Sequence, residues 1–216
     1  MDPAEHAALL ASVQLVAEPW RDSAYYGEAE RWTPYFWNGA MPFRRYFDQL
    51  DLDVVIDLAA GYGRHAEMAA PLCRHLILMD VIAHNLKICR VRLAKRQNIS
   101  YLANNGYDFQ PLPAAAISAI YCYDAMVHFS PEIVAAYLAD SARVLRPGGR
   151  ALFHHSNYDG PPAAHYGQNP HARNHMTAAR FAGLAAQAGL AVLESELIPW
   201  GGLPELDGIT LLERPA

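Results

Sequence analysis

The chain of 216 residues is long enough to form one α/β domain with a full hydrophobic core. Its 17 basic and 22 acidic residues give a formal net charge of −5, which argues against the positive surface that attracts nucleic acid or anionic membranes. We therefore expect a small-molecule substrate, with no nucleic acid and no membrane as partner.

The cysteines and the N-terminus indicate the compartment. Cys73, Cys89 and Cys122 are odd in number and form no C-x-x-C pair, so neither a disulfide framework nor a cysteine zinc site is expected. The stretch MDPAEHAALLASVQLVAEPW carries acids where a signal peptide needs basic residues, and no apolar run reaches the length of a membrane span. We predict a cytoplasmic protein.

Residues 1–49 are a helical lead-in that is dense in Tyr, Trp and Phe between residues 24 and 47. Aromatic side chains at this density are typical of packing against a neighbouring face, and less often of a lid over a ligand. We predict an N-terminal helical aromatic cap on the domain formed by residues 50–216, the two making one structural unit.

From residue 50 onward, short apolar runs alternate with amphipathic helical segments, the pattern of a parallel sheet with crossover helices. Runs predicted as strands are 53–60, 75–81, 99–105, 116–124, 150–157, 190–200 and 208–214. Helices are predicted over 83–97, 130–149 and 177–190, and the loop 201–208 joins the last two strands. The predicted fold is α/β and Rossmann-like: a seven-stranded, mostly parallel sheet with helices on both faces and a C-terminal antiparallel hairpin.

The stretch VVIDLAAGYGRHAEMAA reads as a strand, a turn of small residues and a helix. Such turns let the backbone approach a ligand where a Cβ would collide, and Gly61 and Gly63 hold the close-approach positions. The turn lacks the Gly-Lys-Ser/Thr ending of a P-loop. It also departs from the G-x-G-x-x-G spacing of a nicotinamide site. The spacing favours a different cofactor.

With these motifs the chain resembles the class I S-adenosylmethionine-dependent methyltransferase superfamily, whose first motif is an acid followed by small residues at alternate positions, as in DLAAGYGR. Asp80, at the end of the second strand, matches the acid that accepts hydrogen bonds from both ribose hydroxyls, and a carboxylate is a natural acceptor for a cis-diol. Asn105 and Gly106 match the adenine-edge position. VLRPGG (144–149) matches the turn before the fifth strand.

The resemblance covers residues 50–214 and implies S-adenosyl-L-methionine as the cofactor. The sequence departs from the family pattern at Ala59, where many members have the first glycine, and at Asn105, where an acid is commoner. The residues that we expect to bind the cofactor are Tyr26, Asp57, Ala59, Gly61, Gly63, Arg64, Asp80, Val81, Asn105, Gly106 and Tyr123.

Ligands of a doubly wound sheet bind at the carboxyl ends of the strands, so the segments after the fourth and fifth strands should face the methyl acceptor. His128 and His154 lie there and are the candidates for a general base, because an unperturbed imidazole titrates near neutrality. His154 and His155 are neighbours on one strand, so their side chains point to opposite faces and do not readily chelate one metal. No metal site is predicted.

Residues 155–175 are predicted to form a long segment over the acceptor cleft, rich in His, Asn and Tyr. This composition suits a polar, hydroxylated acceptor such as a sugar or a natural product; the alternative is a solvent-exposed connection. The residues predicted to bind the substrate are Trp37, His155, Asn157, Tyr158, His171 and His175. The basic run 87–96 is predicted as the solvated face of a helix, because no aromatic stacking platform accompanies it.

The sequence thus predicts a methyltransferase of a small polar acceptor, with transfer to a hydroxyl oxygen and a histidine base. Two alternatives stay open: an N-methyltransferase without a dedicated base, and a nicotinamide-dependent oxidoreductase on the same nucleotide-binding fold. The aromatic lead-in is compatible with either a monomer or a homodimer, because it can pack against its own domain or a second subunit.

Overall fold

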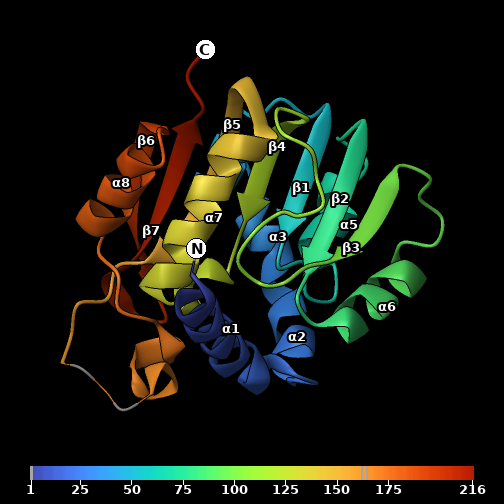
Figure 1. Ribbon diagram of the computed structural model, residues 1–216. Helices are drawn as coiled ribbons and strands as arrows, with labels where there is room; N and C mark the ends of the chain where they lie inside the picture. The colour runs from blue at the N-terminus through green and yellow to red at the C-terminus, as the bar shows by residue number, and fades with distance from the viewer. Residues whose placement is uncertain (1, 162, 164) are drawn as a thin grey trace.

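The computed structural model describes residues 2–161, 163 and 165–216, and one mixed sheet forms its centre (Figure 1). The sheet has seven strands in the order β3-β2-β1-β4-β5-β7-β6. The strands are β1 (Val54–Leu58), β2 (His75–Asp80), β3 (Ile99–Ala103), β4 (Ile117–Cys122), β5 (Leu145–Ser156), β6 (Ala191–Trp200) and β7 (Leu203–Glu213). The first five strands run parallel, whereas β7 is antiparallel to both of its neighbours. The predicted sheet and its C-terminal hairpin are confirmed.

Two predicted boundaries of the sheet were wrong. Most of the predicted loop 201–208 is strand, because the chain turns tightly at Gly201 and Gly202 and β7 begins directly after them. Both glycines have positive φ, of 56° and 83°, as a two-residue hairpin turn requires. The second wrong boundary is the start of β5. This strand begins earlier than predicted, because Leu145 already pairs with Ile117 before a register shift.

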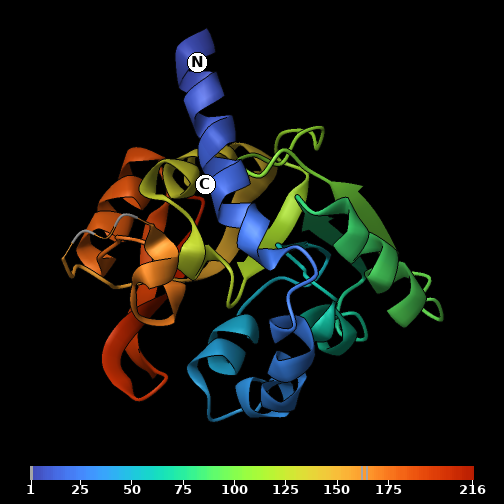
Figure 2. The same ribbon diagram turned by 90° about the horizontal axis from the view of Figure 1, so that it is seen from below.

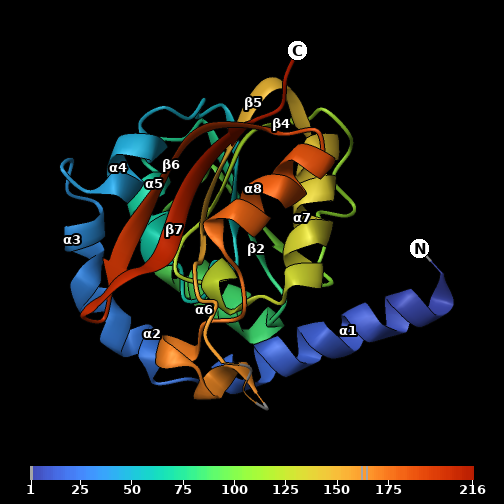
Figure 3. The same ribbon diagram turned by 90° about the vertical axis from the view of Figure 1, so that its left-hand side faces the viewer.

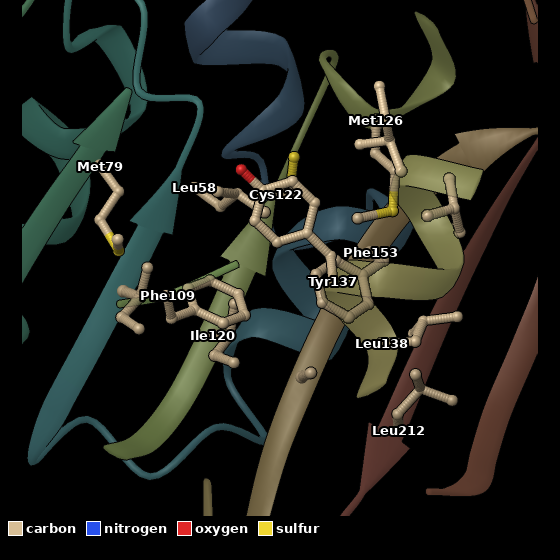
Figure 4. Close-up of a cluster of buried hydrophobic side chains, with 14 of the residues drawn as sticks. Leu58, Met79, Phe109, Ile120, Cys122, Met126, Tyr137, Leu138, Phe153 and Leu212 are labelled. Atoms are coloured by element: carbon tan, nitrogen blue, oxygen red, sulfur yellow. The ribbon is translucent and has the colours of Figure 1, made fainter. Parts of the chain in front are cut away.

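Helices cover both faces of the sheet (Figure 3). The helices after the lead-in are α5 (Arg64–Ala69), α6 (Ala83–Arg92), α7 (Pro131–Val144) and α8 (Ala178–Gln187). The strands alternate between two cores: Ile56 of β1 packs with the α7 and α8 side chains, and its neighbour Val55 packs with those of α5 and α6. In the α7 core, Tyr137 of that helix and Phe153 of β5 are among the buried side chains (Figure 4). A parallel sheet with two apolar faces needs both layers.

The lead-in consists of short helices and one longer one. These are α1 (Pro3–Ala17), α2 (Tyr25–Glu28), α3 (Thr33–Phe36) and α4 (Pro42–Phe47). The N-terminal end of α1 projects beyond the body of the molecule (Figures 2 and 3). Phe43 and Phe47 of α4 are buried. The ring centroid of Phe43 lies 4.4 Å from that of Tyr123, and the centroid of Phe47 lies 5.4 Å from that of Tyr121 in β4. Within the described residues, no helix is both long and apolar enough to cross a membrane.

Thr177 is the N-cap residue of α8, and substitutions there test the contribution of this cap to stability. Its Oγ1 accepts the Arg180 backbone N–H at 3.1 Å, and the helix lays Phe181 against the sheet. We expect Thr177→Ala to lower the free energy of unfolding by about 1 kcal/mol, because one helical N–H loses its acceptor. Thr177→Ser keeps the oxygen and is the matched control. Urea denaturation measures both, and equal losses for the two variants would contradict the capping role.

Candidate functional site

A pocket opens at the carboxyl ends of β1, β2 and β4, beneath the lead-in. Its empty volume is about 950 Å³, including the open space at its mouth. Helix α1 contributes Val13, Val16 and Ala17 to its wall. Because β1 lies between β2 and β4, the connections of β1 diverge here, and such switch points are where doubly wound sheets bind ligands.

The turn between β1 and α5 brings backbone to the pocket. Ala59, Gly61 and Gly63 all have positive φ, of 59°, 55° and 80°. A Cβ on Gly61 would lie 2.8 Å from the Tyr26 ring, so only glycine fits beneath that ring. Ala59 and Gly61 line the pocket, whereas Gly63 is the N-cap of α5 and lies against the Cys89 sulfur. Gly63 therefore shapes the turn without lining the pocket.

Asp80 presents a carboxylate to this turn from the end of β2. Its Oδ2 accepts the Gly61 N–H at 2.9 Å, its Oδ1 accepts the Ile82 N–H at 2.8 Å, and the Asn85 amide lies 3.3 Å from both oxygens. Burial raises the pKa of Asp80 to about 6, although the hydrogen bonds oppose this shift. The Asp80 carboxylate also lines the pocket, where the hydroxyls of a ligand could reach it.

Asp57 was predicted to bind the cofactor, and it is not among the residues that line the pocket. It is 3% exposed and its side chain points beside Tyr121, into the α5-side core. Its Oδ2 has no hydrogen-bond partner, and burial raises its pKa to about 7. The alternation of β1 explains the placement, because Leu58 of the same strand is the residue that reaches the pocket.

After β3, the asparagine that faces the pocket is Asn104 and not Asn105. Asn105 closes its own turn, with its Oδ1 accepting the N–H groups of Tyr107 at 3.1 Å and Asp108 at 3.0 Å. Asn104 lines the pocket, and its Oδ1 is buried without a partner. The predicted residue, Asn105, does not line the pocket. Gly106 lines the pocket as expected, with φ +89°.

The other predicted cofactor residues, Tyr26, Arg64, Val81 and Tyr123, line the pocket. The Tyr26 ring stacks on Tyr62 with centroids 4.2 Å apart, and its hydroxyl accepts a hydrogen bond from the Asn85 amide at 3.1 Å. Burial, with the Asp80 charge second, raises the pKa of Tyr26 far above its usual value, so its hydroxyl stays protonated.

Asp124 is the main pocket residue that the sequence analysis missed. It follows β4 with φ +59° and lines the pocket. Its Oδ2 accepts from the Tyr25 hydroxyl at 2.5 Å and from the Arg64 guanidinium at 2.6 Å, while its buried Oδ1 has no partner. An acid directly after an apolar strand could have indicated this residue. The predicted strand 116–124 included Asp124, so it was not recognised as following the strand.

His65 was missed as well. It lies on α5, lines the pocket and is 7% exposed. The Trp37 indole N–H donates to its Nδ1 at 3.0 Å, so a neutral ring carries its proton on Nε2, and that atom has no partner. Burial, followed by the Arg64 charge, holds the pKa of His65 well below its usual value. The ring therefore presents an unpaired N–H donor.

His154 is placed wrongly for a general base. It is fully buried, its Nδ1 accepts the Asp124 backbone N–H at 3.0 Å, and its Nε2 lies 2.9 Å from Asp207 Oδ2. Asp207 also accepts two hydrogen bonds from Arg173, at 2.7 and 2.5 Å. Burial alone would raise the pKa of Asp207, but His154 and Arg173 lower it to about 2. With both ring nitrogens engaged, His154 has none free for an acceptor, and that prediction is corrected.

His128 does face the pocket. It ends the short helix η3 (Met126–His128), and its Nδ1 lies 2.8 Å from the Ala172 carbonyl oxygen. A carbonyl only accepts, so Nδ1 carries the proton and Nε2 has the lone pair. Burial and the Arg173 charge lower the pKa of His128 to about 4. The ring is therefore neutral at pH 7.

A second cavity adjoins the pocket, since Trp20, Tyr25 and His128 line both. Its empty volume is about 660 Å³, including the open solvent at its mouth. The remaining lining residues come from the segment after β5 and from the end of β6: Gly167, Asn169, His171, Ala172, Arg173 and Trp200. The arrangement is two adjacent chambers, one at the glycine-rich turn and one under the segment 166–173.

In comparison with known proteins, residues 55–149 match the family model of a methyltransferase domain. The methyltransferase nsrG of Aspergillus novofumigatus is 28% identical over 109 residues, 48% of this chain and 41% of that protein. The demethylmenaquinone methyltransferase of Tropheryma whipplei is 33% identical over 98 residues, 45% of this chain and 39% of that protein. The chain thus matches about two fifths of the length of these curated relatives.

A solved S-adenosylmethionine-dependent methyltransferase from Mesorhizobium loti has a TM-score of 0.66 and 17% identity, over 82% of this chain and 99% of that one. This chain has a class I methyltransferase fold. The resemblance to that superfamily is confirmed.

Of the residues predicted to bind the substrate, His171 lines the second chamber. Trp37 is 6% exposed in the core beside Phe43. His155 is fully buried on the other face of the sheet, where it stacks on Phe181 at 3.9 Å and its nitrogens contact Ser156 O and Thr210 Oγ1. The predictions for Trp37 and His155 were wrong, because burial in the two cores leaves them no access to the substrate.

The remaining three predicted substrate residues stabilise the segment after β5. Asn157 donates to the Glu205 carbonyl at 2.8 Å and accepts the Ala178 N–H at 2.9 Å, so its amide is used by the fold. Tyr158 and His175 pack on each other with ring centroids 5.2 Å apart. None of the three lines either chamber, and these predictions are corrected. Residues 162 and 164 of the predicted segment 155–175 lie outside the described residues.

Over residues 2–161, 163 and 165–216, no three His, Cys, Asp or Glu side chains are grouped so that they could hold a metal ion.

Ala59 offers a test of the turn. Its φ of +59° lies in the left-handed region, which costs an L-residue roughly 1–2 kcal/mol. We expect Ala59→Gly to raise the free energy of unfolding by about 0.5–1 kcal/mol, since the strain exceeds the entropic cost of glycine. Ala60→Gly is the matched control and should lower stability by about 0.5–1 kcal/mol. Denaturant titration decides, and a loss for Ala59→Gly would contradict the strain.

Proposed function

We propose that this protein is an S-adenosyl-L-methionine-dependent methyltransferase that acts on a small polar acceptor. The observation that carries the proposal is the buried Asp80 carboxylate, which lines the pocket beside the glycine-rich turn at the switch point of the sheet. The match of residues 55–149 to a methyltransferase domain supports it. When bound, the cofactor supplies a sulfonium methyl group to a nucleophile.

The residues of the first chamber fit this cofactor. Asp80 would accept from the ribose hydroxyls, and the unpaired Asn104 Oδ1 would accept from the adenine amino group. The left-handed turn at Ala59 and Gly61 leaves room for the ligand to approach the backbone. Tyr26, above Gly61, would cover the bound cofactor.

For the acceptor, we propose the second chamber and transfer to a hydroxyl oxygen. His128 lines both chambers, and the lone pair of its Nε2 would take the hydroxyl proton. Its pKa of about 4 keeps the ring able to accept at neutral pH. Transfer to an amine without a dedicated base is the alternative. The cap formed by residues 1–49, the cytoplasmic location and the choice between monomer and homodimer stay predictions.

Ligand binding tests the proposed activity without knowledge of the acceptor. We expect S-adenosylhomocysteine to raise the melting temperature of the full chain, by a free energy of about 2.7 kcal/mol at 100 times its dissociation constant. NADH at the same concentration should leave the melting temperature unchanged. Stabilisation by NADH alone would indicate an oxidoreductase, and stabilisation by neither ligand would refute the proposal.

Asp80 makes cofactor binding pH-dependent. The ionised carboxylate accepts two hydroxyls and the protonated one cannot, so affinity should fall as pH drops below the pKa of about 6. At pH 5 roughly a tenth of Asp80 is ionised, and we expect the affinity for S-adenosylhomocysteine to be about tenfold lower than at pH 8. Calorimetry measures this. Asp80→Asn should bind weakly with a flat profile between these pH values; an equally steep profile for the variant would assign the effect elsewhere.

His128 tests the acceptor side. With labelled S-adenosylmethionine and a small-molecule cell extract, His128→Ala should lower the rate of methyl transfer at saturating extract by about 10²–10⁴ and change its half-saturating concentration little. The exposed His84 of α6 provides the control variant His84→Ala, which should keep the full rate. Full activity of His128→Ala would refute the histidine base and favour the N-methyltransferase alternative.

A further inference from the structure

The two chambers meet at side chains from the lead-in and from η3. Trp20 and Tyr25 of the lead-in and His128 of η3 line both chambers, so His128 lies between the cofactor side and the acceptor side. The other walls of the second chamber come from the segment 166–173 and from Trp200 at the end of β6. Figure 3 shows this segment, in orange, beside the lead-in. An acceptor in the second chamber can therefore bring its reacting atom to His128.

The walls of the second chamber carry aromatic rings that are firmly held. The Trp20 ring lies 4.4 Å from the His128 ring, and its indole N–H donates to the Tyr166 hydroxyl at 3.2 Å. On Trp200, the Arg173 guanidinium lies 4.9 Å from the ring centroid. Aromatic rings gain energy from offset-stacked and edge-to-face contacts with one another. Fixed rings from two distant parts of the chain therefore favour a flat aromatic ligand.

The second chamber offers few acceptors for a ligand that is rich in hydroxyls. Within the described part of the chain, no Asp or Glu side chain lines it. Asn169 donates its amide to the Arg173 carbonyl at 2.7 Å, and the Tyr25 hydroxyl donates to Asp124 at 2.5 Å. A sugar brings several hydroxyl donors, and each costs free energy when it is buried without an acceptor. The lining thus suits an acceptor with one reacting hydroxyl better than a sugar.

The orientation and basicity of His128 narrow the kind of hydroxyl. His171 and Ala172, which line the chamber, both have positive φ, of 49° and 55°, a costly conformation that often marks functional segments. The Ala172 carbonyl accepts the Nδ1 proton of His128 at 2.8 Å, which leaves the Nε2 lone pair for the substrate. Because burial and the Arg173 charge lower the pKa of His128 to about 4, this lone pair is a weak base. A phenol, with a pKa of about 10, gives up its proton far more readily than an aliphatic hydroxyl, whose pKa is close to that of water at about 16.

We propose that the second chamber binds a phenol, with the aromatic ring against Trp20 and Trp200 and the hydroxyl at His128 Nε2. This inference rests on the proposed function and names its substrate class. As the O–H proton passes to Nε2, the phenol oxygen forms a bond to the methyl carbon, and the electron pair of the broken carbon–sulfur bond stays on sulfur. The products are an aryl methyl ether and S-adenosylhomocysteine. Arg173 lines the chamber and its partner Asp207 does not, so the pair presents its positive member to the negative charge that develops on the phenol oxygen.

A matched pair of probes tests the aromatic requirement. 2-Naphthol is a phenol, and decahydro-2-naphthol has the same carbon skeleton and hydroxyl without the aromatic rings.

By calorimetry on the full chain saturated with S-adenosylhomocysteine, we expect 2-naphthol to bind about fivefold more tightly than decahydro-2-naphthol or better. Equal affinities, tighter binding of the saturated alcohol, or binding of neither probe would overturn the phenol proposal.

A pair of variants at Trp20 tests the aromatic wall. Trp20→Phe keeps an aromatic ring and should bind 2-naphthol within about twofold of the wild type, whereas Trp20→Leu should weaken it about fivefold, with thermal unfolding showing whether the fold is kept. Trp32→Leu replaces an exposed tryptophan that lines neither chamber, and this matched control should bind as the wild type does. Equal affinities of Trp20→Phe and Trp20→Leu would overturn the contact with Trp20.

The methylated product decides the class of the acceptor. With labelled S-adenosylmethionine and a small-molecule cell extract, we expect the label in an aryl methyl ether, identified by mass spectrometry and NMR. Label in an alkyl ether, as from a sugar, or in a methylamine would overturn the phenol proposal while supporting the methyltransferase activity. Failure of the wild type to bind S-adenosylhomocysteine would instead refute the proposed function.

Discussion

The site depends on the hydrogen bonds that the buried carboxylate of Asp207 makes with His154 and Arg173. This carboxylate lies fully inside the protein, where an unpaired charge is very costly, and its negative charge is balanced by Arg173 and shared with His154. Removing one partner of such a group typically costs about 3–5 kcal/mol. Arg173 comes from the segment after β5, Asp207 from β7 and His154 from β5. One carboxylate therefore joins the hairpin, the central strands and the wall of the second chamber.

The partners of Asp207 contact both chambers. His154 accepts a hydrogen bond from the backbone of Asp124, which lines the first chamber, and Arg173 lines the second. The charge of Arg173 also helps to keep His128 neutral, because it opposes a second positive charge nearby. Burial is the larger cause of the lowered pKa of His128, and the charge of Asp207 opposes the contribution of Arg173. Stability and function share these residues.

Much of the fold could be read from the sequence, because apolar runs and small residues report local requirements. The seven strands followed from short apolar segments, and the glycine-rich turn followed from positions at which a Cβ would collide, as Gly61 and Tyr26 illustrate. Asn105 was predicted from the resemblance to the superfamily, whereas the structure places Asn104 at the pocket. Asp124 was assigned to a strand because an apolar run does not mark where its last paired residue lies.

The sequence by itself determined the sheet, the turn and the superfamily that they resemble, since each depends on residues close together in the chain. Only the tertiary structure decided which polar groups are free to act. Of the adjacent histidines, His154 is bound to an aspartate 53 residues away and His155 to a threonine 55 residues away. His128 keeps a lone pair because its other nitrogen meets a carbonyl 44 residues further on. Chemical availability depends on burial and on distant partners, and local sequence contains neither.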